Sequence, residues 1–402
     1  MWSPTSRLSV GLVVLVVAGA ATIDAAEIPA FGRRYRVSCS MCHSVIPRLS
    51  AFGEVFAGNG FRMASAEPPR DTVGTGDDLL DLYRDLPLAV RLDAYATASL
   101  NGGTDTDFQT PYNIKFLSGG PIAKKLSYYF YFFLFERGEV GGIEDAYVYL
   151  DDIGGQPVDL AVGQFQVSDP MFKRELRLEY EDYALYRARV GLQPADLTYD
   201  RGFMLLTDAA GFTFSAIVVN GNGKGEAEPD RELDNDPLKN FFAHVSRDVV
   251  PGLRLGAMGY YGRQEGTANG GPLVKNSFWI IGADATITAG PAELNLQYIH
   301  RKDDNPTFTT GEPEAVLNGG LAELIFHPRG ARWYGLALYN IVDMNLPLLN
   351  VRLGGPDNVE RYQTLTGGIG YVVRRNVRTF VETTWDLEQD ETRWTLGFTT
   401  GF

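Results

Sequence analysis

The residues best suited to chemistry lie near the start of the chain, in the run Cys39-Ser40-Met41-Cys42-His43. Two cysteines separated by two residues and followed directly by a histidine form the C-x-x-C-H attachment motif of a c-type haem. The spacing suits this chemistry because the two thiols can add across the two vinyl groups of one porphyrin, which places the histidine beneath the ring to bind iron. The sequence therefore predicts one covalently bound haem c, with Cys39 and Cys42 as thioether sites and His43 as the proximal iron ligand.

Two other uses of paired cysteines fit the sequence less well. A structural zinc site needs four nitrogen or sulfur ligands, but the chain has only two cysteines, and His43 is the one histidine near them. A redox dithiol of the thioredoxin type needs a βαβ setting, and the sequence around the motif gives no sign of one. The redox dithiol remains the main alternative to haem.

The second axial ligand of the iron is less clearly marked, since methionine and histidine are both common in electron-transfer cytochromes. Met41 lies inside the attachment loop and cannot reach the opposite face of the ring. Met63 lies farther on and could fold back to that face, so it is the candidate distal ligand, with a packing role as the alternative. The other histidines, His244, His300 and His327, lie far along the chain. A vacant position, open to a small ligand, is also compatible with the sequence.

The elements that must position the motif belong to a short, mainly helical segment, residues 27–66. After Pro47, apolar residues recur at three- and four-residue spacing, which predicts an amphipathic helix: Leu49, Phe52, Val55 and Phe56. Gly58-Asn59-Gly60 predicts the end of that helix. A segment of roughly 40 residues has too little core to be stable alone. We therefore expect the covalent cofactor to act as its structural staple.

The flanks of this segment predict export and a linker. Residues 1–26 resemble a secretory signal peptide, with Arg7, an apolar run at residues 8–21, and small residues at Ala25 and Ala26 for cleavage. The alternative, an uncleaved membrane anchor, is disfavoured because the run is shorter than a comfortable span. Export implies an oxidising compartment. Residues 67–86 are rich in proline, glycine and aspartate and are predicted to be a linker.

From residue 87 to residue 402 the dominant hydrophobic period is two, which predicts β-strands. One clear example sets Val90, Leu92, Ala94, Ala96 and Ala98 against Arg91, Asp93, Tyr95, Thr97 and Ser99. Phe380 breaks the pattern, as an apolar residue on a polar face. About sixteen strand-like stretches can be counted, with one short one doubtful, and bacterial single-chain barrels use an even number. The stretches include residues 112–118 and 186–192.

A soluble β-sandwich would also alternate, but three features favour a transmembrane barrel. The alternation continues without a clear helix; aromatic residues cluster near strand ends, as at residues 128–135, 260–261 and 333–334; and the chain ends on Phe402 in an alternating apolar strand. Lipid cannot satisfy a sheet edge, so such a sheet must close. We therefore predict an all-β transmembrane barrel of about 16 antiparallel strands in the bacterial outer membrane, in contact with the lipid bilayer. The net charge of −14 makes nucleic acid a poor partner.

Residues 31–62 resemble the cytochrome segment of fused monohaem cytochrome–porin proteins, whose best-known members are outer-membrane iron oxidases. The resemblance rests on the C-x-x-C-H motif together with Ala51-Phe52-Gly53-Glu54 and Gly58-Asn59-Gly60-Phe61-Arg62. It implies the same roles for Cys39, Cys42 and His43, and it names neither a distal ligand nor an electron donor securely.

The predicted barrel also resembles the phosphate-selective porins O and P. Three stretches carry this second resemblance: residues 162–167 (VGQFQV), 199–203 (YDRGF) and 218–223 (VVNGNG). It implies a sixteen-strand porin but not phosphate transport, because a fold does not fix a function.

Together these interpretations predict electron transfer across the outer membrane, with the haem segment in the barrel lumen or at its periplasmic side. The apolar band of such a barrel is about 25 Å tall, which one haem cannot comfortably bridge. The expected partners are therefore a periplasmic c-type cytochrome and an extracellular redox partner such as ferrous iron, whose oxidation would make the protein an oxidoreductase. The alternative is a solute porin with a haem-containing plug that gates or senses. An enzyme at an open haem site is a third class, although the sequence shows no acid–base group near His43.

Overall fold

The computed structural model describes residues 30–46, 48–63, 67, 72–80, 82–84, 87–100, 104–171, 175–268, 270–351, 355–374 and 376–402. The predicted signal peptide, residues 1–26, lies outside the described residues, and so does Pro47.

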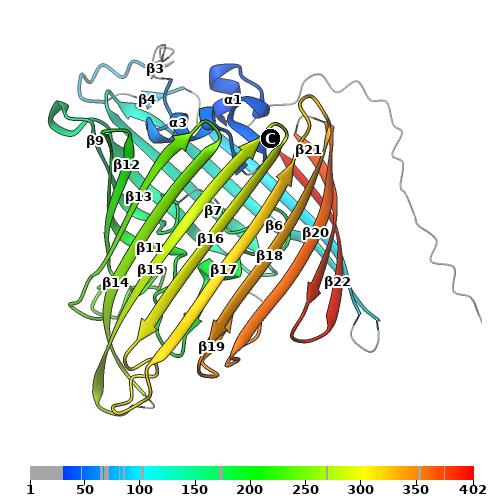
Figure 1. Ribbon diagram of the computed structural model, residues 1–402. Coiled ribbons are helices and arrows are strands. Elements are labelled where there is room, and N and C mark those ends of the chain that lie inside the picture. The colour runs from blue at the N-terminus through cyan, green and yellow to red at the C-terminus, as the bar shows by residue number, and fades with distance from the viewer. Residues whose placement is uncertain are drawn as a thin grey trace, which may run out of the picture.

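Sixteen antiparallel strands form one closed barrel (Figure 1), which confirms the predicted barrel of about 16 antiparallel strands. The strands are β5 (Leu88–Leu100), β6 (Thr104–Ala123), β7 (Leu126–Glu136), β8 (Gly142–Leu150), β9 (Val158–Gln166), β11 (Tyr199–Ala209), β12 (Phe212–Val219), β13 (Asn240–Val250), β14 (Leu253–Thr267), β15 (Leu273–Ala289), β16 (Ala292–Asp303), β17 (Ala315–Phe326), β18 (Trp333–Met344), β20 (Arg361–Arg374), β21 (Val377–Asp386) and β22 (Glu391–Gly401). The last strand, β22, pairs with the first, β5, in a register that sets Leu396 opposite Ala96. Among the described residues, no helix has both the length and the apolar character needed to cross a membrane.

The two-residue period of the sequence separates the two faces of the barrel wall. Outward side chains are apolar and exposed, as at Ile281, Ile369 and Leu396. Inward side chains are often polar and buried, as at Asn295 and Thr395. An apolar exterior on a closed sheet is the arrangement that a lipid bilayer requires.

Phe380 lies on the inward face, and the structure explains this break in the pattern. Its ring packs against Tyr95, with 5.8 Å between ring centroids, and Tyr95 in turn packs against Tyr112 at 4.7 Å. The neighbouring strand provides the space, because a Cβ on Gly397 would lie 2.1 Å from the Phe380 ring. Phe380 is therefore apolar because it belongs to a small aromatic cluster inside the barrel.

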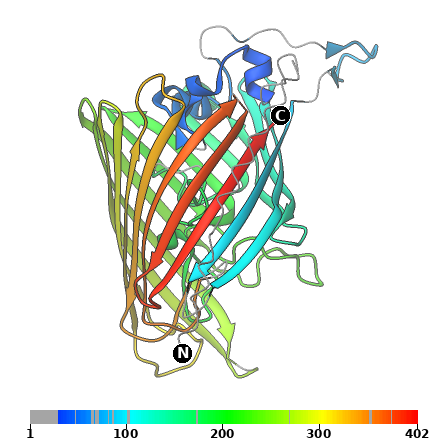
Figure 2. The ribbon, with the colours of Figure 1, turned by 90° about the vertical axis from the view of Figure 1, so that its right-hand side faces the viewer.

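The two ends of the barrel differ in the lengths of their connections. At one end the strands join through short turns, such as residues 124–125, 210–211, 251–252 and 290–291. At the other end lie the longest connections, residues 167–198, 220–239, 304–314 and 345–360. The C-terminus lies at the short-turn end (Figures 1 and 2).

The N-terminal segment lies across the short-turn end (Figures 1 and 2). It contains α1 (Ala30–Tyr35), α2 (Cys39–Cys42), β1 (His43–Val45), β2 (Arg48–Leu49) and α3 (Ala51–Gly58). The predicted amphipathic helix corresponds to α3, whose first turn is capped by the Ser50 side chain accepting from the Gly53 amide at 3.2 Å. Within the predicted linker, β3 (Thr72–Val73) pairs with β4 (Leu82–Tyr83).

The connection between β9 and β11 folds into the barrel, and we call its described residues, 167–171 and 175–198, the luminal segment. It contains α4 (Ala184–Arg187) and β10 (Ala188–Val190), and β10 pairs with β19 (Leu349–Val351) from the connection between β18 and β20. The strand-like stretch at residues 186–192 therefore includes a strand, but one outside the barrel wall. A short 3₁₀ turn, η1 (Ile153–Gly155), joins β8 to β9.

Candidate functional site

The C-x-x-C-H motif begins with a single helical turn. Cys39 and Cys42 are the first and last residues of α2, so their side chains lie on the same side of that turn. Both are partly exposed, and neither is in a disulfide. His43 follows at once as the first residue of β1 and pairs with Leu49 of β2. The structure thus brings the three predicted site residues together at one short corner.

Helix α3 holds this corner through close backbone contacts. The Ser50 amide donates to the Cys42 carbonyl at 2.8 Å, and the Ser50 hydroxyl donates to the Met41 carbonyl at 2.7 Å. Gly53 lies directly over Cys42, because a Cβ at that position would be 2.1 Å from the Cys42 carbonyl oxygen. The approach of α3 to the motif therefore depends on the missing side chain of Gly53.

The environment of Cys42 bears on the redox-dithiol alternative. Burial, followed by the neighbouring Cys39, raises the pKa of the Cys42 thiol above its ordinary value. Reactive redox dithiols depend on a lowered thiol pKa, since the thiolate is the nucleophile. The haem and redox-dithiol interpretations of the motif both stay predictions.

An aromatic cluster within the N-terminal segment joins α1, α3 and the residues that follow α3. Phe31 stacks on Phe61 with 5.1 Å between ring centroids, and its edge meets Phe56 at 5.3 Å. Tyr35 packs edge-on against Phe56 at 5.3 Å, and its hydroxyl donates to Glu67 at 2.8 Å. Burial and the nearby Glu67 carboxylate raise the pKa of Tyr35 well above its ordinary value. The cluster gives this small segment an apolar core.

The candidate second ligands lie in different places. Met63 packs against the cluster formed by Phe56, Ala57 and Phe61, and its role as distal ligand stays a prediction. His244 faces the barrel interior, where it lies 2.8 Å from Asp284. His300 lies on the outward face of β16, where it contacts Asn318 and the Trp279 ring. His327 lies in the turn between β17 and β18, at the short-turn end.

One side of the N-terminal segment docks on the wall formed by β6, β7 and β8. The Phe61 ring stacks on Tyr129 of β7 with 4.7 Å between centroids. Arg62 pairs with Asp151, and the Tyr149 hydroxyl of β8 bonds to the Gly58 carbonyl. Phe31 lies so close to β6 that a Cβ on Gly119 would be 2.9 Å from its ring.

The other side of the segment reaches strands across the mouth of the barrel. Arg48 Nε donates to the Glu293 carboxylate of β16 at 2.7 Å. Arg378 of β21 donates to the Ile46 carbonyl, and its guanidinium lies 3.1 Å from the Glu179 carboxylate of the luminal segment. The segment is therefore bonded to widely separated strands, and through Arg378 it shares a partner with the luminal segment.

The luminal segment fills one side of the barrel with an apolar core. Its fully buried side chains include Leu185, Tyr186, Val190 and Leu197, and the facing wall contributes Leu317, Leu321, Leu338 and Val342. Leu185 packs against β17 where a Cβ on Gly319 would be 2.5 Å from its Cδ1. Val45, two residues after His43, belongs to the same core. This part of the interior is packed with apolar side chains, unlike the polar lumen of a water-filled porin.

The interior along β5 and β6 is charged. Arg91 Nε donates to Asp93 at 2.9 Å, and Arg91 Nη1 donates to Glu175 of the luminal segment at 2.8 Å. Lys115 lies 3.6 Å from the same Glu175 carboxylate and under the rings of Tyr131 and Phe133. These ion pairs tie the luminal segment to β5 and β6.

Neither a protein-family model nor a curated relative matches the chain. Among solved structures, the anion-selective porin from Comamonas acidovorans is 13% identical, with 79% of this chain and 99% of that chain covered and a TM-score of 0.56. The channel DcaP of Acinetobacter baumannii is 11% identical, with 79% and 97% covered and a TM-score of 0.54. The protein has the fold of the outer-membrane porins. At such low identity the likeness concerns the fold alone. Two of the three stretches that resemble porins O and P lie on the neighbouring strands β9 and β11, and the third, residues 218–223, covers the end of β12 and the start of the connection after it.

Sequence reasoning did not find the luminal segment or the bridging arginines Arg48 and Arg378. The available signal was the stretch at residues 175–187, which is charged and tyrosine-rich and loses its two-residue period after Glu181. Inside a predicted barrel, such a stretch indicates a connection folded into the lumen.

Proposed function

We propose that this protein is an outer-membrane cytochrome, in which a haem-bearing N-terminal segment at the mouth of a filled barrel exchanges electrons between a periplasmic c-type cytochrome and an extracellular partner such as ferrous iron. Cys39 and Cys42 would hold the haem and His43 would bind its iron, with Met63 as the candidate distal ligand. The bound haem would supply one-electron chemistry, and the chain would supply position and burial.

The residues of the motif fit a covalently attached haem. The two thiols lie one helical turn apart on one side of α2, both are partly exposed, and the imidazole follows directly. Aromatic side chains of the same small segment lie nearby and suit a flat apolar ring. Met41, between the cysteines, is 40% exposed, so the outer side of the motif is open to solvent.

The observation that carries the proposal is the bonding of Arg378. This one side chain contacts the Ile46 carbonyl, three residues after His43, and also Glu179 and Tyr334 inside the barrel, the latter at 3.4 Å. The N-terminal segment is thus bonded to side chains inside the barrel and does not hang free beneath it. A redox group held at this place would face the barrel interior on one side.

The connections support an orientation. Bacterial barrels have short periplasmic turns and longer extracellular loops, and the N-terminal segment lies at the short-turn end. The segment would then meet periplasmic electron carriers directly. The luminal segment shares Arg378 with the N-terminal segment. It would extend the route for electrons through the protein toward the extracellular side.

The main alternative is a solute porin whose haem segment gates or senses. The apolar packing around Leu185 and Val342 disfavours free passage of solutes through the barrel as it stands. The charged side around Arg91 and Lys115 is the route that solutes would take if the segment moved.

The test uses the full chain purified from outer membranes. A c-type absorption spectrum is expected, and the double variant Cys39→Ser/Cys42→Ser should lack it while keeping the folded barrel. In vesicles, the wild-type protein should let external ferrous iron reduce an entrapped acceptor, with little leakage of small sugars. A colourless protein would overturn the cytochrome assignment. A coloured protein that leaks sugars and passes no electrons would support the gated porin.

A further inference from the structure

The N-terminal segment is basic, although the chain as a whole is acidic. Residues 30–63 contain a single acidic residue, Glu54, and five arginines, which gives them a net charge of +4 in a chain whose net charge is −14. The arginines are Arg33, Arg34, Arg36, Arg48 and Arg62. A positive surface attracts negatively charged partners and speeds their encounter. The charge of this segment therefore favours an acidic partner at the C-x-x-C-H motif.

Two of the five arginines are not neutralised by a carboxylate. The other three form the ion pairs Arg34–Glu67, Arg48–Glu293 and Arg62–Asp151. Arg33 donates to the Leu88 carbonyl, which carries no net charge, and neither Arg33 nor Arg36 pairs with a carboxylate of the described residues. Both side chains are exposed, and Arg36 lies only three residues before Cys39. The end of α1 thus presents two uncompensated positive charges close to the motif.

The turns at the short-turn end add positive charge around the segment. Three of their basic residues are exposed: Lys124, Arg329 and Arg332. The two acidic residues of these turns, Asp151 and Asp152, are each already paired with a cation. The exposed Asp77 and Asp78 lie between β3 and β4, in a hairpin that projects to one side of the segment (Figure 2). The acidic groups near this end therefore leave the charges of Arg33 and Arg36 uncompensated.

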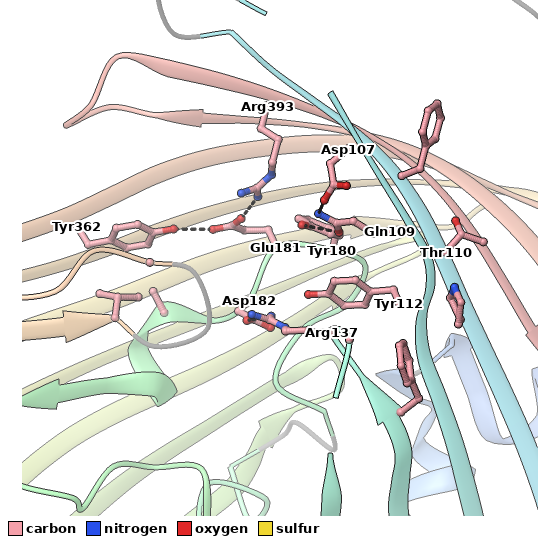
Figure 3. A pocket seen from close by; sticks show the side chains of 17 residues that line it. Asp107, Gln109, Thr110, Tyr112, Arg137, Tyr180, Glu181, Asp182, Tyr362 and Arg393 are labelled. Atoms are coloured by element: carbon pink, nitrogen blue, oxygen red, sulfur yellow. Dashed lines mark hydrogen bonds and ion pairs between the residues drawn. The ribbon is translucent and has the colours of Figure 1, made fainter. Parts of the chain in front are cut away.

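The opposite end of the barrel has the opposite balance of charge. A cleft of about 550 Å³ faces the long-loop end, where β6 and β22 begin (Figure 3). Three carboxylates and two guanidinium groups line it: those of Asp107, Glu181, Asp182, Arg137 and Arg393. The 220–239 connection at the same end contains six acidic and three basic residues. An acidic protein is therefore repelled at the long-loop end and attracted at the short-turn end.

Two large apolar side chains of the segment are also exposed. Met41 of α2 is 40% exposed and Val55 of α3 is 62% exposed. The two helices are held together at this place, since the Ser50 hydroxyl donates to the Met41 carbonyl at 2.7 Å. Transient electron-transfer complexes use small interfaces, in which charged groups steer the partner and set its orientation. Exposed apolar side chains together with uncompensated arginines suit such an interface.

We propose that this surface of the N-terminal segment docks the acidic face of a periplasmic c-type cytochrome, with Met41 and Val55 as apolar contacts and Arg33 and Arg36 as charged contacts. The inference rests on the proposed function, because it names the docking surface and the charge of the partner in that electron transfer. An anionic lipid headgroup is the competing occupant. The segment is bonded to inward-facing side chains such as Tyr149 and Arg378, so it lies over the mouth of the barrel, which favours a soluble partner.

The test measures binding of two forms of cytochrome c to the full chain in neutral detergent by microscale thermophoresis. The native form is basic, and succinylation of its lysines makes the second form acidic. The acidic form should bind about tenfold more tightly at low salt, and the difference should vanish near ~1 M salt, where charges are screened within about 3 Å.

Charge reversal locates the surface. Arg33→Glu/Arg36→Glu should weaken binding of the acidic form about tenfold. Arg36→Glu alone, which keeps the bond from Arg33 to β5, should weaken it by part of that factor. Arg231→Glu is the matched control, because Arg231 is also exposed and also has a left-handed backbone, with φ 74° against 55° for Arg36, but lies at the long-loop end. Heat-modifiable gel mobility reports whether each variant keeps its barrel.

Two results would overturn the proposal. One is equal binding of the two forms of cytochrome c to the wild-type chain. The other is unchanged binding of the acidic form by the folded Arg33→Glu/Arg36→Glu variant, and if that variant instead loses binding to phosphatidylglycerol vesicles, the surface contacts lipid.

Electron transfer is recorded separately, as reduction of the bound acidic cytochrome c after ferrous iron is added. Charge-dependent binding without reduction would support the docking surface and count against the proposed electron transfer. Reduction that is equally fast in the wild type and in Arg33→Glu/Arg36→Glu would support the electron transfer and count against this surface.

Discussion

Arg48 of the N-terminal segment and Glu293 of the barrel form an ion pair in which Arg48 Nε lies 2.7 Å from the Glu293 carboxylate. The Arg48 side chain is 8% exposed, and Glu54 of α3 lies on the same guanidinium at 3.3 Å. Burial lowers the pKa of Arg48, but the carboxylates of Glu293 and Glu54 together raise it above its ordinary value. One permanently charged side chain therefore joins β2, α3 and β16.

Replacing Arg48 by alanine should loosen the docked N-terminal segment. The change leaves the Glu293 carboxylate without this cation. We expect the free energy that holds the segment on the barrel to fall by about 2–3 kcal/mol, because breaking a buried ion pair is costly but the partial exposure of Glu293 reduces that cost. Hydrogen exchange of the α3 amides should become faster while exchange in the barrel strands stays unchanged. The exposed Arg36, changed to alanine, is the control. Unchanged α3 protection in Arg48→Ala would show that this pair does not hold the segment.

Gly53 and Gly58 offer a matched pair of substitutions within α3. A Cβ on Gly53 would meet the Cys42 carbonyl oxygen at 2.1 Å, whereas a Cβ on Gly58 would meet nothing within 4 Å. Gly53→Ala should therefore push α3 away from the motif and lower the amount of haem attached per chain several-fold. Gly58→Ala should leave the amount of attached haem unchanged, because its Cβ meets no neighbour and alanine is the better helix former. The measurement is c-type absorbance per mole of folded barrel, and equal values for both variants would contradict the expectation.

Removing the luminal segment should open the barrel. Its two ends lie side by side, because the Val167 amide donates to the Thr198 carbonyl at 2.6 Å and the Ser168 amide to the Leu197 carbonyl at 3.3 Å. Replacing residues 169–196 by Asn-Gly would close a two-residue hairpin at this point. We expect single-channel conductance in planar bilayers to rise from near zero to that of an open pore.

The control for this deletion is a chain in which residues 225–233 of another long connection are shortened. That variant should conduct no more than the wild type. A folded deletion variant that remains closed would mean that other parts of the chain fill the lumen.

Gly319 tests the packing between the luminal segment and the wall. An alanine there would place its Cβ 2.5 Å from Leu185 Cδ1, and Leu185 is fully buried and has little room to move. Overpacking of this kind costs about 1–3 kcal/mol. The temperature at which heat-modifiable mobility is lost should fall in Gly319→Ala. Gly367→Ala adds a Cβ that meets nothing within 4 Å, so this temperature should stay unchanged in that variant.

The barrel was predictable from the sequence because the alternation of apolar and polar residues that forms it is a local pattern. Each strand needs only alternate residues of opposite character, as from Val90 to Ala98, and lipid enforces the same rule on all of them. The predicted count of about sixteen strands was confirmed. The stretch at 112–118 was too short, since β6 extends from Thr104 to Ala123 through polar residues that the apolar pattern does not mark.

The interior could not be predicted in the same way, because its contacts join residues far apart in the chain. Arg48 and Glu293 are separated by 245 positions, and Arg378 and Ile46 by 332. Nothing near Arg48 in the sequence signals its partner. The C-x-x-C-H motif can be recognised in the sequence because its five residues are consecutive, but the haem that it predicts stays a prediction. Met63 as distal ligand also stays a prediction, because that position requires a fold-back that the sequence leaves open.

The N-terminal segment leads into β5 at the mouth on which it is seated, and Arg33 of that segment bonds to the Leu88 carbonyl at the first residue of β5. The chain therefore need not thread through its own cylinder to reach this position. A prosthetic group could be attached to the segment before the strands enter the lipid, and insertion could follow from the same side without carrying the loaded segment through the bilayer. Maturation of the two parts would then be ordered in time but confined to one compartment.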